Sequence, residues 1–274
     1  MDVISVTDPG DTRLETFRHL RDADLLRAHG LFVAEGRFVV ERVLADPRFA
    51  FEALLLNRAS LDALRHALDG RIGGSAVFEC PTQAFESITG FDFHRGCLAL
   101  VRRLPALHWQ EAVGSARVIL VLEGVTNADN VGAVFRNAAS FGAGAVLLSP
   151  TCCDPLYRKA IRTSMGHALR VPFARVEPWP DVLTELHAAG FTVAALSPRG
   201  TAITLDAFAA THRDKQVALL VGSEGTGLTE AAGRVADLRV RIPMAPGVDS
   251  LNLAVATGIA LSSLRTAEGR SLQV

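Results

Sequence analysis

The chain has 274 residues, of which 49% are hydrophobic and 21% are charged, and its formal net charge is −1. A chain of this length exceeds what one compact core usually holds, so the length predicts two globular domains. The near-neutral charge argues against a surface that is basic overall, although it leaves room for a local basic patch. No apolar run approaches the roughly 18 residues of a membrane span, and the first residues lack the pattern of a secretory signal.

The first 105 residues alternate helix-like and strand-like segments. Apolar residues at helical spacing predict a helix within residues 12–29. Short apolar runs predict strands at Leu31–Ala34, Phe51–Leu56, Ala76–Phe78 and Cys97–Val101. Helix-like stretches separate these strands, at Arg37–Leu44, Leu61–Leu68 and Pro81–Ile88. We therefore predict a small N-terminal α/β domain, residues 1–105, which ends in a linker.

The remaining residues, 106–274, carry a second series of short, continuous apolar runs. These runs predict strands at Val118–Leu122, Ala145–Leu148, Val171–Ala174, Phe191–Leu196, Val217–Val221 and Leu238–Ile242. Continuous apolar strands are typical of a parallel sheet that is buried on both faces. Helix-like segments follow the strands, the last of them at 251–266. This alternation predicts a doubly wound α/β domain, in which ligands bind outside the carboxyl ends of the strands.

The cysteines bear on the compartment and on metal binding. They are Cys80, Cys97, Cys152 and Cys153, and no two of them have the C-x-x-C spacing of zinc ligands. Reduced thiols inside the cell are the natural interpretation of such a set. We therefore expect a cytoplasmic protein without a metal site.

The loop after the first strand of the second series is polar. It begins at Glu123 and contains Asn127 and Asn130, either of which can cap the start of a helix. Arg136 follows within a helical segment that otherwise looks apolar, where an arginine needs a partner. That partner is either a buried carboxylate in a structural ion pair or a bound anion such as a phosphate.

A glycine-rich loop, Gly222-Ser-Glu-Gly-Thr-Gly227, follows the strand at 217–221. It is not a P-loop, because no Lys-Ser/Thr pair follows, and it does not have the G-x-G-x-x-G spacing. Its glycines allow the backbone to approach a ligand closely. Glu224 is less expected at this place, and it either caps the next helix or belongs to a binding site.

A third loop, Ile242-Pro-Met-Ala-Pro-Gly247, leads to Ser250-Leu-Asn252 and then to a run of small apolar residues. The apolar run predicts a buried helix, and Ser250 can be the N-cap of that helix. Capping by Ser250 does not account for Asn252, which is then expected inside the first turn.

Taken together, these loops resemble the SpoU (TrmH-type) RNA ribose 2′-O-methyltransferases of the SPOUT superfamily. The motifs follow the order of that family: Asn130-x-Gly-x-x-x-Arg136 with Phe-Gly142, then Gly222-Ser-Glu-Gly-x-Gly227, then Ile242-Pro-Met and Ser250-Leu-Asn252. The resemblance covers roughly residues 117–266 and includes the intervening segment Ser164–Pro172. Asn137 departs from the family, in which a small hydroxyl residue is common after the arginine. Residues 12–45 resemble the substrate-binding domain of many members, which has a ribosomal-protein-like RNA-binding fold.

The resemblance implies a cofactor, S-adenosylmethionine, bound in a deep trefoil knot within the C-terminal part of the catalytic domain. Backbone groups of Gly222, Ile242 and Leu251 are expected to hold the cofactor, with Leu196 and Met244 nearby. The resemblance also implies a homodimer in which the helices of the first and third motifs meet, and a reaction that needs no metal.

The implied reaction transfers a methyl group to a ribose 2′-hydroxyl, which is a poor nucleophile until it is deprotonated or well oriented. A guanidinium rarely deprotonates, so we expect Arg136 to clamp a neighbouring phosphate and thereby align the 2′-oxygen. Asn130 and Asn252 then set the ribose through hydrogen bonds. Glu224 orients Arg136 or Asn130, and Ser250 completes the polar network.

Several alternatives remain open at this point. The substrate is ribosomal RNA, which the N-terminal domain favours, or transfer RNA. The protein is an active methyltransferase, which the intact motif residues favour, or a knotted RNA-binding protein without activity. The residues Arg158, Lys159 and Arg162 either contact RNA phosphates or form a solvated helix face.

Overall fold

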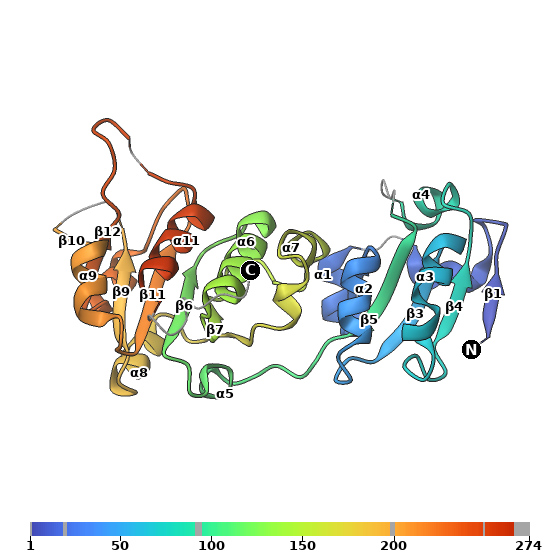
Figure 1. Cartoon of the computed structure of the whole chain (residues 1–274), viewed down its shortest axis with the longest axis horizontal. Helices are drawn as coiled ribbons and strands as arrows, with labels where there is room; N and C mark the ends of the chain where they lie inside the picture. Colours follow the sequence, from blue (N-terminus) through green and yellow to red (C-terminus); the bar gives the residue numbers. More distant parts are fainter. Residues whose placement is uncertain (1, 19–20, 91–94, 198–200, 249, 266–274) are drawn as a thin grey trace. The chain divides into compact units, whose positions relative to one another are not determined.

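The computed structural model describes residues 2–18, 21–90, 95–197, 201–248 and 250–265. The chain divides into two compact units, whose helices and strands are labelled in Figure 1. Unit 1 comprises Met1–Pro105 together with Leu156–Leu169, and unit 2 comprises Ala106–Pro155 together with Arg170–Val274. The segment Leu156–Leu169, which the sequence analysis places in the second domain, therefore belongs to the first unit.

Unit 1 is built on a mixed five-stranded sheet in the order β1-β4-β3-β5-β2. The strands are β1 Val3–Ser5, β2 Leu31–Glu35, β3 Phe51–Leu56, β4 Ala76–Glu79 and β5 Cys97–Arg102. β5 is antiparallel to both of its neighbours, and the other pairs are parallel. The predicted strands are confirmed within one residue at each end, whereas β1 is too short to leave an apolar pattern in the sequence.

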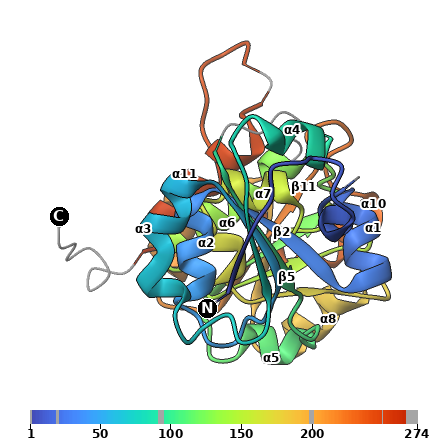
Figure 2. The same ribbon diagram turned by 90° about the vertical axis from the view of Figure 1, so that its right-hand side faces the viewer.

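Helices cover both faces of the unit 1 sheet. α2 (Arg37–Leu44) and α3 (Arg58–Leu68) pack against each other and lie together on one side of the strands (Figure 2). The core on the other face is formed by side chains of the 3₁₀ helix at Thr12–Phe17, the π-helix at Leu25–His29 and α4 at Ala84–Thr89. Two elements of the segment Leu156–Leu169 complete unit 1, α7 (Arg158–Thr163) and the 3₁₀ turn His167–Leu169.

The single helix predicted at 12–29 is wrong. The region contains the 3₁₀ helix, the three-residue α1 (Asp22–Asp24) and the π-helix, while residues 19–20 lie outside the described residues. Leu14 and Phe17 are fully buried and three residues apart, which fits the three-residue turn of a 3₁₀ helix better than an α-helix. The stretch ends where Gly30 adopts a φ of +61°, a conformation that glycine reaches without steric cost.

Unit 2 is built on a seven-stranded sheet in the order β10-β12-β9-β11-β6-β7-β8, and all of its pairs are parallel. The strands are β6 Val118–Glu123, β7 Ala145–Leu148, β8 Phe173–Arg175, β9 Thr192–Leu196, β10 Ile203–Thr204, β11 Val217–Gly222 and β12 Leu238–Arg241. The predicted parallel sheet is thereby confirmed. β8 begins two residues later than predicted, after Pro172, which has no amide hydrogen to donate to a neighbouring strand.

The helices of unit 2 lie on both faces of this sheet. α5 (Trp109–Val113), α8 (Asp181–Ala188) and α10 (Glu230–Val235) share one core with the strands. α6 (Ala128–Phe141), α9 (Leu205–His212) and α11 (Leu253–Ser263) form the other layer, in which α6 and α11 pack side by side (Figure 1). The predicted last helix is found as α11, although residue 266 of its predicted range lies outside the described residues. No helix in the described part of the chain is long and apolar enough to cross a membrane.

Candidate active site

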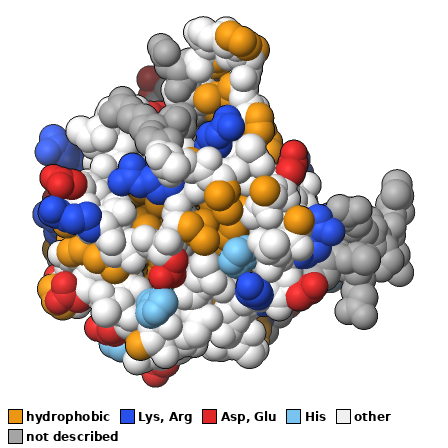
Figure 3. Space-filling model, turned by 90° about the vertical axis from the view of Figure 1, so that its left-hand side faces the viewer, with side chains coloured by type: hydrophobic (Ala, Val, Ile, Leu, Met, Phe, Trp, Pro, Cys, Tyr) orange, Lys and Arg blue, Asp and Glu red, His pale blue; other side chains and the backbone are white. Residues whose placement is uncertain are grey.

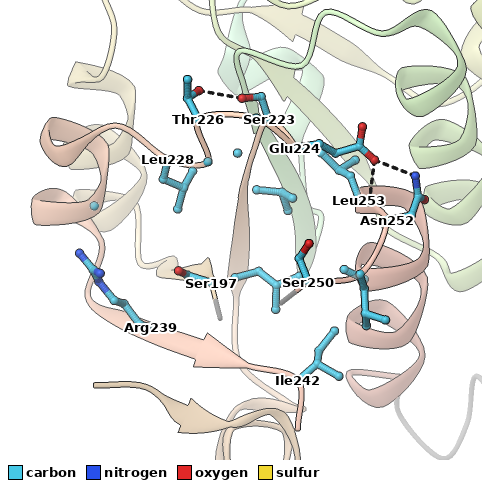
Figure 4. Close-up of a pocket in the computed structure, with 18 of the residues that line it drawn as sticks. Ser197, Ser223, Glu224, Thr226, Leu228, Arg239, Ile242, Ser250, Asn252 and Leu253 are labelled. Carbon is cyan, nitrogen blue, oxygen red and sulfur yellow. Dashed lines mark hydrogen bonds between the residues drawn. The ribbon is translucent and has the colours of Figure 1, made fainter. Parts of the chain in front are cut away.

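A cavity of about 440 Å³ opens at the carboxyl ends of β9, β11 and β12 in unit 2 (Figure 4). Its walls come from the ends of these strands, from the glycine-rich loop after β11 and from the start of α11. The five residues expected to hold a cofactor all line it, namely Leu196, Gly222, Ile242, Met244 and Leu251. The cavity therefore lies where a doubly wound sheet binds its ligand.

Gly222 is required by the fold of its own loop. A Cβ at this position would lie 2.3 Å from the backbone carbon of Gly227, closer than any real contact. The loop folds back because the amide of Gly227 donates a 2.9 Å hydrogen bond to the carbonyl of Ser223 and because Gly227 adopts a φ of +71°. The glycines thus shape the wall of the cavity before any ligand is considered.

Glu224 joins the first and third motifs. Its Oε2 accepts a 2.8 Å hydrogen bond from Nδ2 of Asn130 on α6. Its Oε1 accepts a 2.8 Å bond from Nδ2 of Asn252 and a longer one, 3.5 Å, from the amide of Leu253 at the start of α11 (Figure 4). Capping of the helix that follows the loop is therefore not the role of Glu224. The carboxylate lies instead at the N-terminus of α11, where the helix dipole favours a negative charge.

Asn252, and not Ser250, is the N-cap of α11. Its Oδ1 accepts hydrogen bonds from the amides of Ala254 at 3.0 Å and Val255 at 3.3 Å. The expectation that Asn252 lies inside the first turn is wrong, because α11 starts only at Leu253. Because Oδ1 of Asn252 is bonded to the helix, its Nδ2 is directed to Glu224. The same Nδ2 also donates to Oδ1 of Asn130 at 3.2 Å. One side chain thus fixes both the helix start and the polar network.

The two asparagines of the loop after β6 have separate roles. Asn127 is the N-cap of α6, and its Oδ1 accepts a 2.8 Å hydrogen bond from the amide of Asp129. Asn130 lies one turn further along the helix, is buried, and directs its amide to Glu224 and Asn252. Of the two partners expected for Glu224, the structure therefore selects Asn130 over Arg136.

Arg136 lies outside this network. It sits on α6 with an exposed side chain, it is not among the residues that line the cavity, and it makes no hydrogen bond or ion pair to any described residue. The expectation of a structural ion pair with a buried carboxylate is wrong. Arg136 is exposed, whereas the preceding Val134 and Phe135 are buried and Phe135 packs against Phe173 of β8, so an apolar helical segment can still present one cation to solvent.

Ser250 lines the cavity but does not complete the network. Its side chain is exposed and makes no hydrogen bond to the described residues. The physical reason is that Asn252 occupies the cap position that Ser250 was expected to take.

A buried carboxylate that the sequence analysis did not single out as functional supports the glycine-rich loop. Glu123, at the end of β6, is 4% exposed. Its oxygens accept hydrogen bonds from Nε1 of Trp179 at 2.6 Å, from Oγ1 of Thr229 at 2.7 Å and from the amide of Thr229 at 2.8 Å. Thr229 in turn caps α10, so Glu123 holds the C-terminal end of the loop against the sheet. The one feature of the sequence that could have indicated this role is a glutamate placed directly after an apolar strand.

Asn137 ties α6 to α11. Its Nδ2 donates to the carbonyl of Ala254 at 2.6 Å and to Oγ1 of Thr257 at 3.3 Å. The helices meet closely at Gly258, where a Cβ would lie 3.2 Å from the Asn137 amide. An asparagine side chain is longer than the small hydroxyl residue that is common here in the family, and it therefore reaches across from α6 to α11.

Arg239 is the cationic side chain among the described residues that line the cavity. It extends from β12 over α10, where a Cβ at Gly233 would lie 3.1 Å from one of its terminal nitrogens. The opposite wall carries Glu224 and Asn252 (Figure 4). The described lining of the cavity therefore combines apolar residues with one cation, Arg239, and two carboxylates, Glu224 and Glu230.

The fold and the cavity define a ligand-binding domain of the doubly wound α/β class. The model of the SpoU rRNA methylase family matches residues 117–262, and the chain belongs to that family. An uncharacterized tRNA/rRNA methyltransferase of Mycobacterium bovis is 43% identical over 99% of this chain and 94% of its own length. The family recognised from the motifs is thereby confirmed.

Two further relatives are informative. The 23S rRNA (guanosine(2553)-2′-O)-methyltransferase RlmP of Bacillus subtilis is 28% identical over 85% of this chain and 88% of its own length. The structure of an AdoMet-bound rRNA methyltransferase from Sinorhizobium meliloti is similar with a TM-score of 0.81 and 26% identity, covering 96% of this chain and 97% of that one. Both similarities extend over the two units.

Proposed function

We propose that the protein transfers the methyl group of S-adenosylmethionine to a ribose 2′-hydroxyl of RNA. The observation that carries this proposal is the cavity, whose apolar wall adjoins the hydrogen-bonded set Asn130, Glu224 and Asn252. The solved relative from Sinorhizobium meliloti binds AdoMet, and the relative from Bacillus subtilis is named for a 2′-O-methylation, which supports both halves of the proposal.

The residues of the cavity fit the proposed cofactor. Its volume of about 440 Å³ falls in the range of roughly 300–1,000 Å³ that is usual for small-molecule sites. Leu196, Ile242 and Leu251 would offer an apolar surface to the adenine, and Arg239 would pair with the carboxylate of the methionine part. When bound, the cofactor supplies an electrophilic methyl group on a sulfonium, and the protein must bring a nucleophilic oxygen to it.

The polar set retains the hydrogen-bonding capacity that a ribose hydroxyl needs. Three donors occupy the Glu224 carboxylate, which leaves one acceptor site out of about four. Asn130 uses one of its two amide hydrogens on Glu224 and keeps the other. A hydroxyl both donates and accepts, so Glu224 and Asn130 can orient the 2′-oxygen, while Asn252 fixes the positions of both. This orientation supplies the geometric part of catalysis.

We further propose that the protein is a homodimer formed through α6 and α11. Val255 and Ile259 lie one turn apart on α11 and expose 50% and 38% of their surface, an apolar stripe that a second copy would cover. Arg136 is exposed on the neighbouring helix α6. In such a dimer Arg136 clamps a phosphate of an RNA that runs across the interface, which explains why it has no partner in one described chain.

The remaining parts of the proposal rest on the motif resemblance. They are a deep trefoil knot around the cofactor, an RNA-binding role for unit 1 and a cytoplasmic location. We favour ribosomal RNA as the substrate because the matching family and the relative from Bacillus subtilis are named for it, with transfer RNA as the second candidate.

Isothermal calorimetry of the purified protein tests the cofactor part of the proposal. S-adenosylmethionine should bind with a stoichiometry of one per chain, and ATP should not bind. Binding of ATP in preference to S-adenosylmethionine would overturn the proposal in favour of an unrelated nucleotide-binding enzyme.

A further inference from the structure

The described part of unit 1 exposes two large hydrophobic side chains, and both lie in one place. They are Phe38 on α2, which is 45% exposed, and Met165 after α7, which is 40% exposed. Arg42 links them: its guanidinium carbon lies 4.5 Å from the centre of the Phe38 ring, and a Cβ at Gly166 would lie 3.2 Å from its Cδ. A single exposed apolar side chain is ordinary, but here Phe38 contacts Arg42 and Met165 directly precedes the glycine that lies beside the same arginine, so the two form one patch.

Basic side chains of α7 stand beside this patch. Arg158 and Arg162, one turn apart, both approach the buried carboxylate of Glu35 on β2, at 3.6 Å and 3.7 Å. Lys159, between them, is exposed, and the side chain of Arg162 keeps 44% of its surface exposed. Glu35 therefore anchors α7 to the sheet while the helix retains a positive face.

Six residues form this α2–α7 surface: Phe38, Arg42, Arg158, Lys159, Arg162 and Met165. Three carboxylates bring negative charge to it: Glu35 is buried, Glu41 is exposed on α2, and Asp22 accepts a 3.0 Å hydrogen bond from the amide of Arg158. On the end of unit 2 that Figure 3 displays, by contrast, basic and acidic side chains are interspersed around a hydrophobic centre. That face offers no continuous basic surface.

We propose that the α2–α7 surface binds the RNA substrate at an unpaired nucleotide. The cations of α7 hold phosphates, and a base stacks on Phe38 beside the guanidinium of Arg42. Aromatic rings flanked by arginines are the usual platform for unstacked bases, and phosphate contacts fix the register of the strand. This inference rests on the proposed function, since it assigns a contact to the same RNA.

The placement of α7 in unit 1 supports this role. The segment Leu156–Leu169 lies between β7 and β8 of unit 2 in the sequence but is part of unit 1 in the structure. Its basic residues and the aromatic residue of α2 therefore act as one surface, although only the basic residues stand out in the sequence.

Fluorescence anisotropy with two labelled RNAs tests this surface on the full-length protein. One probe is a stem–loop with an unpaired hexanucleotide loop, and the other is the same stem as a blunt duplex. Phe38→Ala should weaken binding of the stem–loop by roughly five- to a hundredfold, the effect of losing one base stack, and should leave duplex binding unchanged. Phe38→Tyr, which keeps the ring, should bind both probes as the wild type does. Arg162→Gln should weaken both probes and lower the slope of log K against log salt by about one.

Matched controls come from exposed residues away from this surface. Leu107→Ala removes an exposed apolar side chain of unit 2, and Arg65→Gln removes an exposed guanidinium of α3; neither should change RNA affinity. Thermal unfolding of each variant reports whether it folds, and Phe38→Ala should fold because the side chain is exposed.

Unchanged stem–loop affinity in both Phe38→Ala and Arg162→Gln would overturn the proposal, as would a wild type that does not bind the stem–loop. A change in the sedimentation of the protein alone, with RNA affinity unchanged, would reassign the surface to a contact between protein copies. Failure of the proposed function would give a different result. The wild-type protein would then neither bind S-adenosylmethionine nor transfer a methyl group, while Phe38→Ala would still weaken its binding of RNA.

Discussion

The amide of Asn130 donates a 2.8 Å hydrogen bond to the carboxylate of Glu224, which follows it by 94 residues in the chain. The same carboxylate accepts from Asn252 at the start of α11. Three loops that are distant in the sequence thus converge on one negative charge beside the cavity. The negative charge of Glu224, and not only the shape of its side chain, holds these residues together.

Glu224→Gln should lower the rate of methyl transfer by about 10- to 100-fold. A glutamine keeps the size of the side chain but replaces one acceptor oxygen by an NH₂ group, which then opposes an amide of Asn130 or Asn252. Loss of a hydrogen bond to a charged group costs about 1.5–3 kcal/mol. Single-turnover assays measure the rate, and Asp214→Asn, an equivalent change on an exposed turn, should be silent. Full activity of Glu224→Gln would show that methyl transfer does not need the negative charge of Glu224.

Arg136→Ala should reduce methyl transfer by more than about 100-fold while the affinity for S-adenosylmethionine stays unchanged. The side chain is exposed and lies outside the cavity, so its loss should alter the free energy of unfolding by no more than about 0.5 kcal/mol. Calorimetry and a methylation assay on the same preparation make the comparison, with Lys215→Ala as a control for the loss of one exposed cation. A parallel collapse of cofactor affinity would show that Arg136 is not a phosphate clamp.

Glu123→Gln should lower the free energy of unfolding by about 1.5–3 kcal/mol and weaken S-adenosylmethionine binding. The buried carboxylate accepts three hydrogen bonds, and a glutamine would place an NH₂ group against the donors of Thr229 or Trp179. The C-terminal end of the glycine-rich loop would then lose its attachment to β6. Urea unfolding and calorimetry give the two quantities. Trp179→Phe removes only one of the donors and should have the smaller effect on cofactor affinity; the reverse order would contradict a role for Glu123 in holding the loop.

Arg239→Gln should weaken S-adenosylmethionine binding about tenfold but leave the binding of 5′-methylthioadenosine unchanged. The two ligands share the adenosine part, and only the first has a carboxylate that can pair with the guanidinium. Calorimetry with both ligands isolates that one interaction. An equal loss for both ligands would mean that Arg239 shapes the cavity without pairing with the carboxylate.

Much of unit 2 could be predicted because its strands are buried on both faces. A strand such as Ala145–Leu148 shows as an uninterrupted apolar run, and its predicted bounds agree with the structure. The loops of the site were also found from the sequence, because their three motifs, which contain Asn130, Glu224 and Asn252, follow the order of the SpoU family. That every expected cofactor residue lines one cavity follows from strand ends meeting at one edge of a parallel sheet.

Other features depend on contacts that no local pattern records. The cap of α11 is Asn252 instead of Ser250 because one side chain must serve both the helix and Glu224. The orientation of Arg136 depends on which side of α6 faces the sheet, and the attachment of α7 to unit 1 depends on the buried charge of Glu35. Each of these is decided by residues that lie far away in the sequence.

The central claim is that this cavity directs a methyl group to a ribose 2′-oxygen of RNA. The most direct test maps alkali-resistant linkages, which mark 2′-O-methylated riboses, in ribosomal and transfer RNA from a deletion strain and from its parent. We predict that one site loses resistance in the deletion strain, regains it with the wild-type gene, and does not regain it with the Glu224→Gln variant. Two results together would contradict this claim: the deletion strain and its parent have the same alkali-resistant linkages, and the purified protein methylates no site of the unmodified RNA.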